Sequence, residues 1–88
     1  MKLKYNFAIK EVLGMYLAVS VGEENKKFEG VLRLNEIGKN ILELLQEGKE
    51  EYEVVATLKK EYDATDDQLH AEVKKIIDQL QSEGIIEE

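Results

Sequence analysis

The 88-residue chain contains no cysteine and only one histidine, His70. Without cysteine it cannot form disulfide bonds, thiolate metal sites or a cysteine nucleophile, and this composition fits a reducing compartment. Long apolar runs are also missing: those present are only a few residues long, whereas a membrane-spanning helix needs about 20. Residues 1–6 lack the apolar stretch of a signal peptide. We therefore expect a soluble, cytoplasmic protein with no membrane partner.

Residue combinations that carry catalysis or hold a cofactor are likewise absent from the sequence. Nucleophilic catalysis needs an activated Ser, Cys or Lys beside a base, and His70 has no matching nucleophile motif. The six glycines are isolated, whereas phosphate-binding loops need several glycines at fixed spacing. No acidic pair has the ligand pattern of an EF-hand, and a metal-binding role for His70 is disfavoured. The sequence thus predicts no enzyme activity, no cofactor and no metal site.

The composition is that of one small folded domain spanning residues 1–88. Hydrophobic residues make up 43% of the chain, and a disordered chain would be poorer in Val, Ile and Leu. A chain of this length buries roughly 60–65% of its unfolded surface, which allows one modest core. With 19 Asp and Glu against 12 Lys and Arg, the formal net charge is -7. This charge argues against nucleic acid as a partner, because phosphates would be repelled.

The N-terminal part of the chain predicts three antiparallel strands, because it holds short alternating stretches rich in β-branched and aromatic residues. The strands are expected at residues 7–9, 15–21 and 27–34. Gly14 lies between the first two strands as a turn. In the third strand, side-chain alternation places Phe28, Leu32 and Leu34 on one face of the sheet.

From Asn35 onward, apolar residues recur at helical spacing and predict three helices. The helices are expected at about residues 36–46, 52–62 and 65–83. Asn35 is expected to cap the first helix, and Thr65 with Gln68 forms a capping box at the start of the third. Gly48 and Gly84 are expected to end the first and third helices. The apolar stripes that should face the core are Ile37, Ile41, Leu44 and Leu45, then Val55, Leu58 and Tyr62, then Leu69, Val73, Ile76 and Leu80.

The order of elements predicts an α+β, winged-helix-like fold with a three-stranded antiparallel sheet followed by a three-helix bundle. Winged helices often bind DNA, but the third predicted helix carries five acidic residues against two lysines. That composition suits a helix in the major groove poorly. A winged-helix transcriptional regulator, or another protein–protein interaction module, stays open as the alternative function.

An unpaired sheet edge beside the third helix is the predicted binding site. If the third strand lies at an edge, its free N–H and C=O groups can pair with an extended peptide. The third helix would supply the other wall of the site. On this helix, residues at helical spacing form a second stripe beside the core stripe. On the pattern alone, the simpler interpretation is that Ile77 widens the core face and that His70 and Lys74 are ordinary surface residues. The same edge could also pair with its own copy in a homodimer.

Several short motifs lie in a fixed order over nearly the whole chain. They are Leu34-Asn35-Glu36-Ile37-Gly38, Ile41-Leu42-Glu43-Leu44-Leu45, Gly48, Glu61-Tyr62-Asp63 and Leu80-Gln81-Ser82-Glu83-Gly84-Ile85-Ile86. In this order the motifs resemble the PqqD-like family, whose members act in pyrroloquinoline quinone biosynthesis and, more widely, as recognition elements for ribosomally made, modified peptides.

The resemblance implies a compact winged-helix-like domain without enzyme activity of its own. Such a domain would capture the leader of a precursor peptide between its third strand and third helix, and present it to a modifying enzyme, often of the radical SAM class. Neither the precursor nor the final product, pyrroloquinoline quinone or another modified peptide, is specified by these motifs. The residues expected to contact the peptide are Phe28, Glu29, Gly30, Val31, Leu32, Arg33, His70, Lys74, Ile77 and Gln81.

Overall fold

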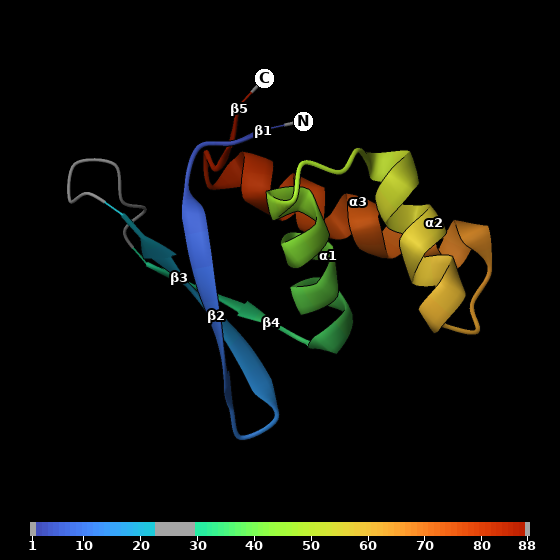
Figure 1. Ribbon diagram of the computed structural model, residues 1–88, viewed down its shortest axis with the longest axis horizontal. Coiled ribbons are helices and arrows are strands. Elements are labelled where there is room, and N and C mark those ends of the chain that lie inside the picture. The colour runs from blue at the N-terminus through green and yellow to red at the C-terminus, as the bar shows by residue number, and fades with distance from the viewer. Residues whose placement is uncertain (1, 23–29, 88) are drawn as a thin grey trace.

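The computed structural model describes residues 2–22 and 30–87, which form an antiparallel sheet followed by three helices (Figure 1). The predicted α+β, βββααα architecture is therefore confirmed. Two very short strands that the sequence pattern did not predict join the N-terminal and C-terminal ends. The strands are β1 (Lys2–Leu3), β2 (Asn6–Val12), β3 (Met15–Val21), β4 (Val31–Leu34) and β5 (Ile86–Glu87).

The main sheet has the strand order β2-β3-β4, with both pairings antiparallel. The central strand β3 covers the predicted residues 15–21, whereas β2 is longer than residues 7–9 at both ends. A two-residue turn at Leu13 and Gly14 joins β2 to β3, since Val12 pairs with Met15. All three helices lie on one side of this sheet (Figure 1).

The helices begin and end close to the positions that local signals predict. They are α1 (Glu36–Gln46), α2 (Glu51–Glu61) and α3 (Asp66–Ser82). Asn35 caps α1, since its Oδ1 accepts from the Gly38 N–H at 2.9 Å. Thr65 and Gln68 form the predicted capping box, with bonds of 2.9 and 3.1 Å. None of the helices in the described ranges is long and apolar enough to cross a membrane.

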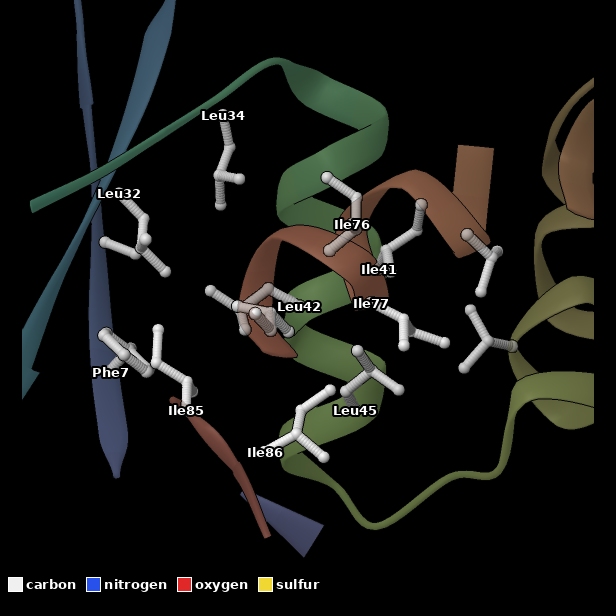
Figure 2. Packing of buried hydrophobic residues seen from close by; sticks show 14 of the residues in the cluster. Phe7, Leu32, Leu34, Ile41, Leu42, Leu45, Ile76, Ile77, Ile85 and Ile86 are labelled. Atoms are coloured by element: carbon white, nitrogen blue, oxygen red, sulfur yellow. The ribbon is translucent and has the colours of Figure 1, made fainter. Parts of the chain in front are cut away.

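The core lies between the inner face of the sheet and the helices (Figure 2). Alternation along β4 directs Leu32 and Leu34 inward, as predicted. The predicted core stripe of α3 is buried throughout, but Leu42 and Val54 are also fully buried although they lie outside the predicted stripes of α1 and α2. Both helices therefore bury a wider face than the spacing indicated, because each packs against more than one element.

The short pair of β1 and β5 ties the two ends of the chain together. Lys2 pairs with Glu87 and Leu3 with Ile86, and the Lys4 N–H donates to the Ile85 carbonyl at 2.7 Å. Gly84, at φ +73°, turns the chain out of α3 in the left-handed conformation predicted for it. The turn delivers Ile85 and Ile86 into the core, where both are buried.

Candidate functional site

Strand β4 forms one edge of the main sheet. Within the described residues its only strand partner is β3, and Ala18 faces Leu32 in their register. Val31 and Arg33 alternate with the buried leucines and are exposed on the outer face of the sheet. An edge of this kind presents backbone donors and acceptors in a row, ready to pair with another extended chain.

The opposite edge of the sheet, on β2, is covered by a side chain. The amide of Gln46, at the end of α1, accepts from the Phe7 N–H at 2.6 Å and donates to the Phe7 carbonyl at 3.3 Å. Gln46 thus occupies the position that a neighbouring strand would take. The β2 edge is therefore blocked at Phe7, whereas the strand order leaves β4 as the other edge of the sheet.

The Gln46 bonds also fix which groups of β4 face the open edge. Because Phe7 directs its N–H and C=O away from β3, the alternation of an antiparallel ladder directs those of Ser20 and Ala18 toward β4. The paired residue Leu32 then directs its own groups back toward β3. By the same alternation, the N–H and C=O groups of Val31 and Arg33 point to the open edge.

Leu34 of β4 and Ile76 of α3 both lie next to Gly38. A Cβ atom placed on Gly38, in the first turn of α1, would lie 3.3 Å from Ile76 Cδ1 and 3.5 Å from Leu34 Cβ. The missing side chain at Gly38 therefore leaves room for both residues, which belong to the core shown in Figure 2.

The four residues predicted to form the helical wall of the site differ in their surroundings. Ile77 is only 6% exposed and belongs to the core, as the simpler interpretation held. His70 lines a hollow between α3 and α2, together with Tyr52 and Val55 of α2. Lys74 and Gln81 are exposed, and helical spacing puts them on the same flank as His70. By the same spacing, Glu72 and Gln79 share a flank of α3 with Ile76.

The predicted pairing strand is shorter in the structure than in the sequence pattern. Gly30, at φ +125°, lies in a bend before β4, so it is not part of the strand. A glycine tolerates this backbone angle, which other residues rarely adopt. Phe28 and Glu29, also expected to contact the peptide, lie outside the described residues.

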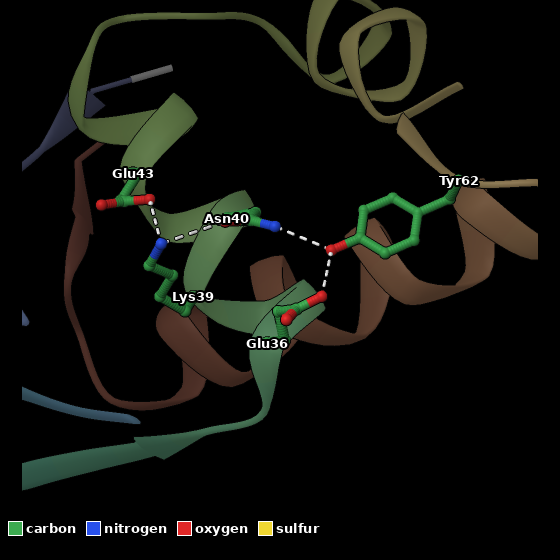
Figure 3. A network of polar contacts seen from close by, with 5 residues as sticks. All are labelled: Glu36, Lys39, Asn40, Glu43 and Tyr62. Atoms are coloured by element: carbon green, nitrogen blue, oxygen red, sulfur yellow. Dashed lines mark hydrogen bonds and ion pairs between the residues drawn. The ribbon is translucent and has the colours of Figure 1, made fainter. Parts of the chain in front are cut away.

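A polar network next to the site holds α1 against the end of α2 (Figure 3). The Asn40 side-chain amide donates to the Tyr62 hydroxyl at 2.7 Å, and this hydroxyl donates to Glu36 at 3.2 Å. Lys39 pairs with Glu43 at 3.2 Å and donates to the Asn40 carbonyl oxygen at 3.4 Å. The network positions the N-terminal turn of α1, and with it the junction to β4.

Two groups of this network have shifted pKa values. Burial raises the pKa of the Tyr62 hydroxyl above 10.0, and the contact with Glu36 adds to the rise while the bond from Asn40 opposes it. The hydrogen bond to Glu43 raises the pKa of the Lys39 ammonium group above 10.5. Both shifts favour the protonated forms of the Tyr62 hydroxyl and the Lys39 ammonium group at neutral pH.

The described part of the chain contains no group of three or more His, Cys, Asp or Glu side chains placed to hold a metal ion. The polar groups at the edge of β4 are instead the backbone amides and carbonyls of Val31 and Arg33. This arrangement can hold an extended chain by main-chain hydrogen bonds.

Comparison with known proteins gives one family and one solved structure. A family model described as coenzyme PQQ synthesis protein D (PqqD) matches residues 21–86. No curated protein matches the chain significantly. The solved structure of TbiB1 in complex with the TbiA(beta) leader peptide is similar, with a TM-score of 0.73 and 18% sequence identity. The alignment covers 99% of this chain and 95% of the TbiB1 chain, so the two share a fold over nearly their whole lengths.

Proposed function

Since the chain belongs to the family of coenzyme PQQ synthesis protein D (PqqD), we propose that it binds the leader segment of a ribosomally made precursor peptide and presents that peptide to a modifying enzyme. The observation that carries the proposal is the open edge of β4, in a sheet whose other edge is covered at Phe7 by Gln46. The similar TbiB1 structure, which contains a leader peptide, supports it.

In this proposal the leader adds a fourth strand to the sheet. Its backbone pairs with the outward groups of Val31 and Arg33, which gives affinity that depends little on sequence. Alternate leader side chains then point to opposite faces of the extended sheet. One set meets the flank of α3 that carries Glu72 and Gln79 beside the largely buried Ile76, and the other set lies on the outer face.

The contact residues proposed on α3 differ from those of the sequence pattern. The Ile76 flank, with Glu72 and Gln79 beside it, is proposed alongside the predicted stripe, of which His70 lies near α2 and Ile77 lies in the core. Lys74 and Gln81 stay predicted contacts, as do Phe28 and Glu29. Strand residues Val31, Leu32 and Arg33 keep their proposed role.

The chemistry belongs to the partner enzyme in this proposal, and the chain itself does not catalyse. We propose a radical SAM enzyme as that partner, and a cytoplasmic location, because precursor peptides are made on ribosomes there. The alternative winged-helix regulator is not favoured, because α3 carries Asp66, Asp67, Glu72 and Asp78 against Lys74 and Lys75.

Titration calorimetry with the leader of the precursor peptide tests the proposal. The wild-type chain should bind this leader saturably at micromolar or lower concentration, and should bind neither a scrambled leader nor a DNA duplex. Salt-sensitive binding of the duplex, without binding of the leader, would instead establish a regulator.

A matched pair of variants locates the binding edge. Val31→Pro removes an outward N–H at the first residue of β4, where proline is tolerated in strands, whereas Val31→Thr keeps the N–H and the branched shape. The proline variant should lose at least tenfold in leader affinity and the threonine variant should bind like wild type. Equal affinities would contradict strand addition at β4.

A further inference from the structure

The outer face of the main sheet is apolar and uncovered. The three helices lie on the other side of the sheet (Figure 1), yet the described part of the chain exposes seven large hydrophobic residues, of which all but Tyr52 belong to the outer face or its hairpin tip. The register aligns these side chains across the three strands. They are Val12, Leu13, Met15, Val19, Val21 and Val31.

Leu13 is the most unusual of them. Its side chain is 99% exposed, and its backbone has φ +51°, the left-handed region that a leucine rarely adopts. Together with Gly14 at φ +82° it forms a two-residue hairpin turn of the kind that favours Asn-Gly. A leucine here strains the backbone and its exposed side chain buries nothing, so it is available for a contact outside the chain.

The charges on this face are all of one sign. Among the described residues that point outward, Lys10 and Arg33 are the charged ones, and both are cations although the whole chain has a net charge of -7. Arg33 also borders a hollow of about 290 Å³ with Leu13 and Leu17. The hollow suits an apolar side chain that lies next to a carboxylate.

We propose that the outer face of the sheet is the docking surface for the peptide-modifying enzyme, which binds it with apolar side chains flanked by Asp or Glu. This rests on the proposed leader binding: a leader strand on β4 extends the same face, so an enzyme seated there contacts its carrier and its peptide together. A second copy of the chain fits less well, because pairing the face with itself would offer Lys10 and Arg33 no carboxylate partner from the opposite face.

Two variants test the surface without touching the leader edge. Leu13→Asn removes the exposed leucine and relieves the turn, so it should fold at least as well as wild type. Lys10→Glu reverses a charge on β2, the strand farthest from β4 in the sheet order. Tyr52→Ser is the matched control, because it removes an exposed apolar side chain on α2. The probe is the modifying enzyme encoded in the operon of the precursor, immobilised for biolayer interferometry.

Leu13→Asn and Lys10→Glu should each weaken enzyme binding at least tenfold while leader affinity by calorimetry stays within twofold, and Tyr52→Ser should change neither. Unchanged enzyme binding in both variants, or no enzyme binding by wild type, would overturn the docking surface. Sedimentation experiments showing that the wild-type chain dimerises through Leu13 would also overturn the docking surface. Failure of wild type to bind the leader would instead sink the proposed function itself.

Discussion

At the scale of single residues, two positions show how much one side chain changes. At Gly38 a missing side chain leaves room for Leu34 and Ile76, and at Leu13 a side chain ill suited to the left-handed region occupies a strained turn. The first position serves the packing around β4. The second costs stability, and its effect can be measured without any partner.

We predict that Leu13→Asn stabilises the protein by about 1 kcal/mol, because asparagine tolerates the left-handed conformation better than leucine does. In a domain of this size that corresponds to a rise in Tm of roughly 4–8 °C. Differential scanning calorimetry measures the change. Leu13→Ala is the control, since it removes the side chain but keeps the strain; an equal rise in both variants would show that exposure rather than backbone strain is responsible.

Gly38→Val should destabilise the protein by about 1–3 kcal/mol, the usual effect of forcing extra methyl groups into a packed site. Its side chain would press on Asn35 Oδ1, which lies 3.1 Å from the Cβ position, and on Ile76 Cδ1. Urea unfolding measures the loss. A variant as stable as wild type would mean that α1 moves away from α3 at little cost.

At the scale of elements, the connections between helices and strands depend on polar side chains. Gln46 joins α1 to β2, and Tyr62 joins the end of α2 to α1. Neither role has a signature in the sequence. A glutamine at the end of a helix and a tyrosine on an apolar stripe fit many structures equally well, because their partners lie 39 and 22 residues away.

Removal of the Gln46 amide should expose the β2 edge. Gln46→Ala leaves the Phe7 N–H without this acceptor, and we predict a loss of about 1–3 kcal/mol in the free energy of unfolding. In this variant the rate of hydrogen exchange should rise more at the Phe7 amide than at the Ala8 amide, because the Ala8 N–H faces β3. If the two amides quicken equally, the loss is global and Gln46 does not protect this edge specifically.

The Tyr62 network predicts a loss of stability at alkaline pH. The folded state raises the pKa of Tyr62 above that of the unfolded chain, so its contribution is complete below about pH 10 and disappears as pH rises through the folded pKa. The Tm of wild type should therefore fall more than that of Tyr62→Phe between about pH 9 and pH 11. Lys39, whose pKa is also raised, titrates in both wild type and Tyr62→Phe. Parallel curves of Tm against pH for these two proteins would contradict the role of Tyr62.

Helix limits were predictable because their signals are local. Asn35, Thr65 and Gly84 each act within one turn of the helix end that they define. The pairing of β1 with β5 was not predictable, since each strand has two residues and they lie at opposite ends of the chain. Helical spacing likewise gives the angle between two stripes but not which stripe faces β4, so the choice between the two flanks of α3 stays a prediction.

At the scale of the whole molecule, net charge governs association. A chain at -7 should attract a basic leader segment from a distance, so the association rate should be highest at low salt. Near 0.5 M salt the Debye length falls to roughly 4 Å and the enhancement should vanish. Stopped-flow association measured over a salt series would test this, and an association rate that is independent of salt would rule out long-range steering.

The pairing of Lys2 with Glu87 brings the amino and carboxyl ends to one corner of the fold. A second domain fused through a short linker to either end would therefore leave from almost the same point. A domain fused to the amino end and a domain fused to the carboxyl end should therefore lie at similar distances from β4. A circularly permuted chain, with residues 2 and 87 linked and new ends opened between α1 and α2, would need only a few linker residues to close.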